Sequence, residues 1–511
     1  MRYSKVAACA AALLLPGGAA LAQDGPALLA ASCGGCHSET DAGLSRIAGQ
    51  RKTPEGWLMT IVRMRVAHGL EISGEDQAAL VSYLADTQGL APSEAAPWRY
   101  ALEKDPNHIE MVEEPLASMC ARCHTAARVG LQRRTPEEWA LHIDFHVGQF
   151  PTIEYQALGR DREWYKIARD EIVPLLAETY PLETDAWTAW EAAEKPAVTG
   201  DWVVLTDLPE SGPAYGVLTV TGDAAPYAIS GELTLANGST EPIGGQMNLY
   251  TGYEWRANVT VGGMAYRQVL AMSEDGTSLT GRQFERDNDS LGGVFKAAKA
   301  GSDPMLLGVV PEAIPGQDAM AQIVGTGLDD VQIEGMNGLA DQLTANAAGA
   351  SVHLAGEAAL FTFTAGENTA TAALYGTVDT LTVEPDFTIA RVGGGSDVGP
   401  AAVPAHFKAI GWWNGQDGQP GTEDDIRVGT LAADWRLENS DEIAEAMEDA
   451  TFAGKIDATG IFEPAMAGPN PERPFSTNNA GDLKVVAEAA GQTAAARLVV
   501  TVQRFIDPPI R

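Results

Sequence analysis

The sequence predicts a multidomain α plus β protein, in which an N-terminal all-α domain is followed by three all-β domains. The chain has 511 residues, more than the roughly 250 to 300 residues that one hydrophobic core usually serves. Residues 23–190 are rich in Trp, Leu, Ala and charged residues at helical spacing. After Thr199 the pattern changes to short alternating runs of Val, Leu, Thr and Tyr, which indicates antiparallel strands.

The first 22 residues have the pattern of a secretory signal peptide. Arg2 and Lys5 precede an apolar run over 6–15, and Ala20-Leu21-Ala22 supplies a small-residue cleavage site. This run is too short for a membrane span. We therefore expect cleavage after Ala22 and a soluble, exported protein that is not bound to a membrane.

Turn signals divide the β part of the chain. Asn237-Gly238, Gly262-Gly263 and Asp275-Gly276 are hairpin dipeptides between short strand-like runs. They predict an antiparallel barrel, or as the alternative a small sandwich, and the Gly-rich stretch 393–400 predicts a linker. The expected units are a signal peptide over 1–22, a helical domain over 23–190, an antiparallel β-barrel over 199–302, and immunoglobulin-like β domains over 303–395 and 398–511.

Two Cys-X-X-Cys-His motifs carry the strongest chemical signal, Cys33-Gly-Gly-Cys36-His37 and Cys120-Ala-Arg-Cys123-His124. Two thiols at this spacing add to the vinyl groups of a haem, and the adjacent histidine supplies one axial nitrogen to the iron. A zinc site or a redox-active cysteine pair would leave both histidines unexplained. We predict two covalently bound haem c groups in a periplasmic protein, attached through Cys33, Cys36, Cys120 and Cys123, with His37 and His124 as iron ligands.

A repeat in the helical region suggests the second axial ligand of each iron. Thr53-Pro-Glu-Gly-Trp57 recurs as Thr135-Pro-Glu-Glu-Trp139, and the seventh residue after the tryptophan is Met64 in one copy and His146 in the other. Both residue types ligate haem iron. We predict His37/Met64 ligation for the first haem and His124/His146 ligation for the second. The open alternatives are Met59 and His68 near Met64, and His142 and His108 near His146.

Charge and cysteine content limit the other partners. The formal net charge of −35 argues against nucleic acid, whose phosphates require a basic surface. Cys9 leaves with the signal peptide and the other four cysteines belong to the haem motifs, so no disulfide is expected. The acidic stretch 414–425 lacks the spacing of an EF-hand loop, and we expect a solvated turn around Asp417 rather than a calcium site.

Taken together, these features resemble the dihaem alpha subunit of quinohemoprotein amine dehydrogenase. The resemblance covers essentially the whole mature chain, through the signal peptide, both haem motifs, the Thr-Pro-Glu-X-Trp repeat, the trailing β domains and the segment Ala-His-Phe-Lys-Ala-Ile-Gly-Trp-Trp at 405–413. It implies a periplasmic heterotrimer that oxidises primary amines. A small partner subunit would carry cysteine tryptophylquinone, and a β-propeller subunit would help to enclose that cofactor.

In such a complex this chain would pass electrons through its two haems to a soluble acceptor, a cupredoxin or a cytochrome c. No cysteine remains for the quinone cross-link, so the chain alone is not expected to oxidise amine, and no catalytic residue is predicted on it. Two other functions stay open. A dihaem cytochrome c peroxidase needs an iron with an open position, whereas the repeat offers both irons a sixth ligand. A binding protein that carries a cytochrome beside its β domains is the third reading.

Overall fold

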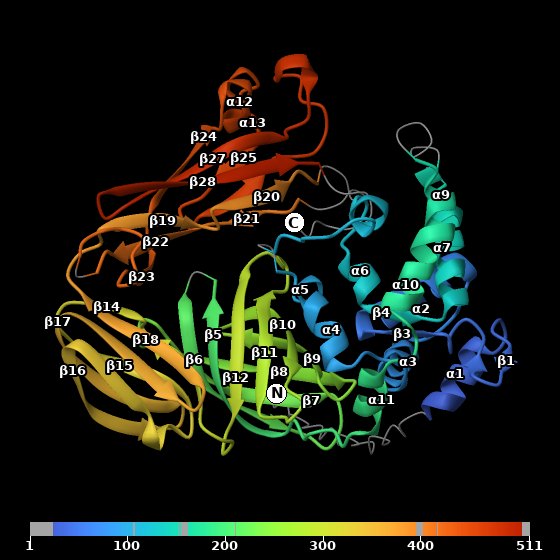
Figure 1. Cartoon of the computed structure of the whole chain (residues 1–511), viewed down its shortest axis with the longest axis horizontal. Helices are drawn as coiled ribbons and strands as arrows, with labels where there is room; N and C mark the ends of the chain where they lie inside the picture. The colour runs from blue at the N-terminus through green and yellow to red at the C-terminus, as the bar shows by residue number, and fades with distance from the viewer. Residues whose placement is uncertain are drawn as a thin grey trace, which may run out of the picture.

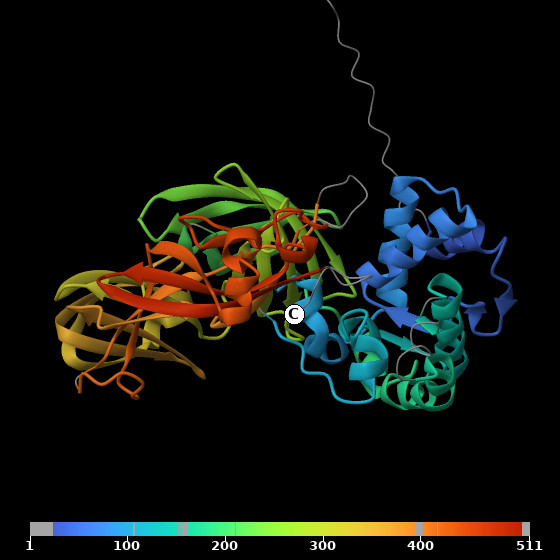
Figure 2. The same ribbon diagram turned by 90° about the horizontal axis from the view of Figure 1, so that it is seen from above.

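The computed structural model describes residues 24–105, 108–151, 153–154, 162–209, 211–394, 402–415 and 417–502. The predicted signal peptide and its cleavage site lie outside these ranges. Among the described residues, no helix is long and apolar enough to cross a membrane. The helical region lies on one side of the molecule and the β-sheets lie on the other, in both Figure 1 and Figure 2.

Two similar helical units are joined by a two-stranded sheet. Strand β3 (Gln50–Lys52) of the first unit pairs antiparallel with β4 (Gln132–Arg134) of the second. The first unit contains α1 (Gly25–Cys33), β1 (Glu39–Thr40), β2 (Gly43–Leu44), α2 (Pro54–His68) and α3 (Gly74–Thr87). The second contains α6 (Ala127–Gly130), α7 (Pro136–Gln149), α9 (Trp164–Ile167), a π-helical turn (Ala168–Ile172) and α10 (Val173–Thr179).

The two Thr-Pro-Glu segments begin matching helices. Thr53 accepts a hydrogen bond from the Gly56 amide at 3.3 Å and caps α2, while Thr135 accepts one from the Glu138 amide at 3.2 Å and caps α7. Proline at the first helical position needs no hydrogen-bond partner for its nitrogen, so it suits both starts.

The repeated tryptophans anchor these helices in the same way. Trp57 and Trp139 are each 1% exposed. The indole Nε1 of Trp57 donates to the Gln88 carbonyl at 3.0 Å, and that of Trp139 donates to the Tyr180 carbonyl at 3.2 Å. Both acceptors directly follow a later helix of their unit, α3 or α10, so the two tryptophans make equivalent contacts.

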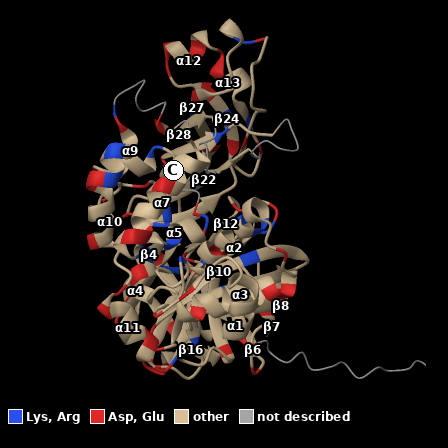
Figure 3. Cartoon of the chain, turned by 90° about the vertical axis from the view of Figure 1, so that its right-hand side faces the viewer, with Lys and Arg blue, Asp and Glu red and all other residues tan. Residues whose placement is uncertain are grey.

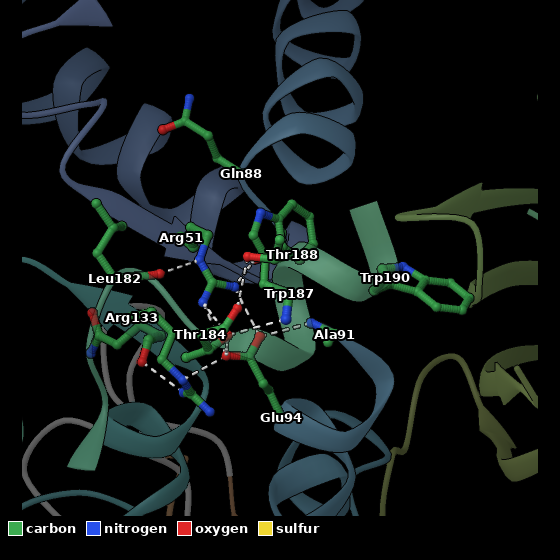
Figure 4. Close-up of polar contacts among 12 residues, drawn as sticks. Arg51, Gln88, Ala91, Glu94, Arg133, Leu182, Thr184, Trp187, Thr188 and Trp190 are labelled. Atoms are coloured by element: carbon green, nitrogen blue, oxygen red, sulfur yellow. Dashed lines mark hydrogen bonds and ion pairs between the residues drawn. The ribbon is translucent and has the colours of Figure 1, made fainter. Parts of the chain in front are cut away.

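A buried ion cluster joins the two units to a third helical segment (Figure 4). Glu94 lies on α4 (Pro92–Ala95), and its carboxylate accepts hydrogen bonds from Arg51 of β3 at 2.8 and 3.0 Å and from Arg133 of β4 at 3.0 Å. The hydroxyl of Thr184 donates to it at 2.9 Å and also caps α11 (Asp185–Ala192). A short 3₁₀ turn (Ala96–Trp98) and α5 (Arg99–Leu102) follow α4.

Eight antiparallel strands close into a barrel, which confirms the barrel prediction. Each of the three hairpin dipeptides lies between consecutive strands, and Trp202, Trp255 and Phe295 are buried in the barrel core. Trp187 and Trp190 of α11 pack against this core, so the helical region and the barrel share one hydrophobic interior. The strands are β5 (Gly200–Leu208), β6 (Gly212–Thr221), β7 (Tyr227–Leu235), β8 (Thr240–Tyr250), β9 (Glu254–Val261), β10 (Met264–Met272), β11 (Ser278–Glu285) and β12 (Gly292–Lys299).

The next part of the chain forms a six-stranded sheet with its own core around Phe361 and Phe363. Its strand order is β13-β15-β17-β18-β14, with β16 paired to β17. The strands are β13 (Met305–Val310), β14 (Ala313–Pro315), β15 (Asp318–Thr326), β16 (Gln332–Asn346), β17 (Gly349–Ala365) and β18 (Asn368–Tyr375).

Three small sheets form the last part, in the orders β19-β22-β23, β20-β28-β27-β24 and β21-β26-β25. Strands β19 (Thr380–Glu384) and β20 (Phe387–Arg391) precede the boundary expected at 395–398, yet they pair with β22 and β28, which follow it. The chain therefore enters this part near Thr380. The immunoglobulin-like character of both later parts stays a prediction. The other elements are β21 (Ala405–His406), β22 (Lys408–Trp413), β23 (Ile426–Leu431), β24 (Asp434–Asn439), α12 (Glu442–Ala446), α13 (Asp449–Phe452), β25 (Gly454–Ile456), β26 (Ile461–Pro464), β27 (Gly481–Ala489) and β28 (Gln492–Thr501).

Acidic residues are distributed over many elements, from α3 and α11 to α12 (Figure 3).

Candidate haem sites

A cavity of about 710 Å³ lies beside the second Cys-X-X-Cys-His motif. Cys120, Cys123 and His124 line it, and so does His146 of α7. Its volume falls in the range of roughly 300 to 1,000 Å³ that is usual for ligand and cofactor sites. The structure therefore brings the predicted attachment residues and both predicted iron ligands of the second haem to one cavity.

The rings of His124 and His146 are separated by a distance that suits one iron atom between them. Their centroids are 6.3 Å apart. Two metal–nitrogen bonds of about 2 Å each, together with the two ring radii, span roughly 6 Å. The alternative His142 lies one helical turn before His146, and these two ring centroids are only 4.8 Å apart. These two histidines therefore cannot ligate opposite sides of one iron, but His142 also lines the cavity and remains the alternative to His146 as the partner of His124.

The three predicted histidine ligands share one hydrogen-bond arrangement. A carbonyl oxygen can only accept, so a bond from Nδ1 to a carbonyl leaves Nε2 with the lone pair that a metal requires. The bonds run from His37 Nδ1 to the Ser45 carbonyl at 2.8 Å, from His124 Nδ1 to the Thr125 carbonyl at 2.8 Å, and from His146 Nδ1 to the His142 carbonyl at 2.7 Å. In the described part of the chain, His68, His108 and His142 make no such bond.

Burial sets the charge state of the groups in this cavity. Burial lowers the pKa of His146 below its usual value, partly offset by the hydrogen bond to the His142 carbonyl, and the neutral imidazole is the form that binds metal. Burial also raises the pKa of the Cys120 thiol to about 12. A redox pair or a zinc site needs a thiolate, so this environment favours neither.

The first motif lies in a more open position. Cys33 and His37 are half-buried and Cys36 is exposed. Met64 is half-buried on α2. No hydrogen bond or ring contact joins His37 to Met64 among the described residues, and the ligation of the first iron by this pair stays a prediction.

The positions of Met64 and His146 on their helices are equivalent. Trp57, Ile61 and Met64 are spaced four and then three residues apart, which places them on one face of α2. The same spacing places Trp139, Ile143 and His146 on one face of α7. Ile61 and Ile143 are both buried, so each face is directed toward the core of its own unit.

The three other alternative ligands, Met59, His68 and His108, lie in different environments. Met59 lines the cavity of the second motif. His68 is exposed in the last turn of α2. The ring of His108 stacks on Tyr100 with the centroids 3.6 Å apart, and His108 is not among the residues that line the cavity.

One group of residues at this site was not anticipated from the sequence, namely the buried cations of the cavity wall. Lys52 is 5% and Arg134 is 4% exposed. Burial and the neighbouring Arg134 lower the pKa of Lys52 well below its usual value, and burial lowers the pKa of Arg134 to about 9. A signal was present, because Gln-Arg-Lys at 50–52 and Gln-Arg-Arg at 132–134 both precede the repeated Thr-Pro-Glu.

Three family models match the chain, and all three describe the alpha subunit of quinohemoprotein amine dehydrogenase. The haem-binding model matches residues 23–187, the domain II model 195–300 and the domain IV model 381–510, which together cover more than half of the chain. The chain belongs to this family. In this quinohemoprotein amine dehydrogenase alpha-subunit chain, both motifs and the Thr-Pro-Glu-X-Trp repeat lie within the haem-binding match, and the closed barrel occupies the domain II match.

No functionally curated protein matches the chain. Solved structures that resemble parts of it include a redesigned β-barrel bound to DFHBI, with 17% identity, 20% of this chain and 94% of that chain covered, and a TM-score of 0.18. A de novo designed fluorescence-activating β-barrel has 14% identity, covers 20% and 92%, and has a TM-score of 0.17. A chimeric titin Z1Z2 has 12% identity, covers 39% and 96%, and has a TM-score of 0.15.

Proposed function

We propose that this chain is the electron-transfer subunit of a periplasmic amine dehydrogenase complex. It receives electrons from a cysteine tryptophylquinone on a small partner subunit during oxidative deamination of primary amines. It passes them through two covalently bound haem c groups to a soluble acceptor, a cupredoxin or a cytochrome c. A β-propeller subunit completes the heterotrimer. The observation that carries this proposal is the convergence of Cys120, Cys123, His124 and His146 on one cavity in a chain of this family.

The residues of the second site suit a haem that stays six-coordinate. Bound haem supplies reversible one-electron chemistry. Cys120 and Cys123 would attach it, and the Nε2 atoms of His124 and His146 would ligate its iron. The carbonyls that accept from both Nδ1 atoms fix the two rings, so that the ligands move little when the charge changes. At the first site Cys33, Cys36, His37 and Met64 would take the corresponding roles.

The same geometry disfavours the peroxidase reading. A peroxide-binding iron needs one free axial position, whereas His124 and His146, whose ring centroids are 6.3 Å apart, could both ligate an iron in this cavity. The reading as a cytochrome-bearing binding protein has weaker support, because the family is defined by membership of a dehydrogenase complex.

The proposal is tested on the complex purified from its periplasm. A primary amine added without oxygen should reduce both haems, and oxidised cupredoxin or cytochrome c should then reoxidise them. Electron paramagnetic resonance should show one bis-imidazole haem and one haem with imidazole and thioether ligands. Peroxide turnover by this chain alone, or haems that no primary amine reduces, would contradict the proposal.

A further inference from the structure

Helix α2 belongs to the first helical unit but forms part of the wall of the second cavity. Its residues Gly56, Met59, Thr60 and Arg63 line the cavity that contains Cys120 and His124. Trp57, Ile61 and Met64 occupy a different face of the same helix. One helix therefore contacts the environment of both predicted haems.

The lining of this cavity is strongly cationic, although the whole chain has a net charge of −35. Among the described residues, seven Lys and Arg side chains line it, against three Asp and Glu side chains. Two of these three carboxylates form ion pairs, because Glu55 pairs with Arg256 at 2.5 Å and Asp289 pairs with Lys104 at 3.6 Å. Lys and Arg side chains therefore outnumber Asp and Glu side chains in this lining by seven to three.

Lys52 and Arg134 show this excess most clearly, because both are almost completely buried. The Lys52 ammonium donates to the Thr60 hydroxyl at 2.8 Å, and in the described part of the chain it forms no ion pair. The nearest carboxylate to the Arg134 guanidinium is Glu138 at 3.7 Å, and Glu138 also pairs with Arg46 at 2.8 Å. One carboxylate therefore serves two arginines, and Lys52 has none.

Arg63 adds a third cation from α2. Its guanidinium stacks on the ring of Phe145 at 4.6 Å, and no hydrogen bond or ion pair joins it to any other described side chain. Buried charges without counter-charges are costly. A cavity wall of this kind is stabilised when its ligand brings negative charge, and a haem carries two propionate carboxylates.

We propose that Lys52, Arg63 and Arg134 bind the propionates of the haem attached at Cys120 and Cys123, so that the first helical unit helps to set the reduction potential of the second haem. This inference rests on the proposed function, because it requires a haem in this cavity. Nearby positive charge favours Fe(II) over Fe(III), so these residues raise the potential of the second haem. That effect opposes the lower potential that a second imidazole ligand gives relative to a thioether.

The test uses the assembled complex and measures the midpoint potential of each haem by spectroelectrochemical titration, with the haems distinguished by their paramagnetic resonance signals. Lys52→Met and Arg63→Gln should each lower the Fe(II)/Fe(III) ratio of the bis-imidazole haem about tenfold at a fixed potential, which is 59 mV for a one-electron couple. The other haem should not shift. Lys52→Arg retains the positive charge, so the bis-imidazole haem of this variant should keep the midpoint potential of the parent.

Arg65→Gln is the matched control. Arg65 lies two residues from Arg63 on α2, is exposed and pairs with the Gln77 side chain at 2.8 Å, so its loss should move neither potential. The inference is overturned if Lys52→Met and Arg63→Gln leave the bis-imidazole haem unshifted, if both haems shift equally, or if Arg65→Gln has the same effect. Should Lys52→Met fail to fold, Arg63→Gln alone decides, because Arg63 is only half-buried.

The potentials are measured without amine, so the two proposals fail separately. A shifted potential in a complex whose haems no amine reduces would contradict the proposed function and leave this inference standing. Normal reduction by amine together with unshifted potentials would contradict this inference and leave the proposed function standing.

Discussion

Replacing Glu94 with glutamine should destabilise the helical region strongly. The side chains of Glu94, Arg51 and Arg133 are only 6%, 5% and 7% exposed. Glutamine preserves the size of the side chain and part of its hydrogen bonding, but it removes the negative charge. Two buried guanidinium groups would then face each other across the β3–β4 sheet without a counter-charge.

The expected magnitude follows from this burial. Removal of one partner from a buried ion pair costs about 3–5 kcal/mol. A matched control is Glu438→Gln, which breaks the Arg436–Glu438 pair at 3.0 Å, where the side chains are 45% and 47% exposed. Loss of an exposed pair costs about 0–1 kcal/mol. The free energy of unfolding should therefore fall by at least about 2 kcal/mol more in Glu94→Gln than in the control.

Urea unfolding followed by circular dichroism measures this difference, with the dependence on urea concentration checked for equality between variants. Burial alone would raise the pKa of Glu94, but the hydrogen bonds and charge of Arg51 hold it below its usual value. For an acid with a lowered folded pKa, the stabilisation is present above the unfolded value, about 4.3, and is lost as the pH falls through the folded value. The gap between parent and variant should shrink in acid. A cost within about 1 kcal/mol of the control at neutral pH would refute the reasoning.

Four further predictions concern the first haem, the barrel and two histidines. Met64→His should convert the first haem to bis-imidazole ligation and lower its midpoint potential; unchanged paramagnetic resonance spectra would make Met59 or His68 the ligand to test. Phe295→Ala should cost the barrel about 3–5 kcal/mol in calorimetry, because Phe295 is 0% exposed, while both haem spectra stay unchanged. Burial lowers the pKa of His406, so the folded state loses stability as the pH falls below about 6.5, and His406→Gln should flatten that loss in thermal unfolding. Hydrogen bonds from His353 to Asp341 and Asp318 raise its pKa, so its stabilisation is present below about pH 6.5 and is lost as the pH rises through the folded value; a His353→Gln variant with the same pH dependence of stability as the parent in that window would contradict this.

Much of the second haem site could be predicted because its parts are local in sequence. The Cys-X-X-Cys-His spacing is set by porphyrin chemistry. Thr-Pro-Glu favours the start of a helix, because threonine can cap the helix and proline suits its first position. Once Trp139 marks the buried face of α7, helical spacing places His146 on that face. Hairpin dipeptides such as Asn237-Gly238 located the barrel turns for the same reason, because they determine backbone geometry within a few residues.

What could not be predicted depends on contacts between distant segments. Lys52 lines the cavity because β3 pairs with β4, and strands of three residues are too short to show a periodic pattern. The parallel pairing of β20 with β28 joins residues near opposite ends of the last part of the chain. No local signal in 387–391 distinguishes that pairing from membership of the preceding sheet.

The register of β3 against β4 is that of a contact between two identical subunits. Gln50 pairs with Arg134, Arg51 with Arg133 and Lys52 with Gln132. Residues 50–52 and 132–134 are equivalent positions of the repeat. Gln50 therefore pairs with the counterpart of Lys52, and Lys52 pairs with the counterpart of Gln50. This reciprocity defines an isologous interface around a two-fold axis. At this sheet the two repeats therefore meet as two identical subunits of a dimer would.

On such an axis a true homodimer would place two identical arginines face to face. Here Glu94, which belongs to neither copy of the repeat, lies between Arg51 and Arg133 and forms an ion pair with each. A single covalent chain permits one asymmetric residue on a symmetric axis, which two separate identical subunits could not supply without a duplicate. The two halves can therefore keep a common interface while they diverge where their chemistry differs, with Met64 at one predicted distal position and His146 at the other.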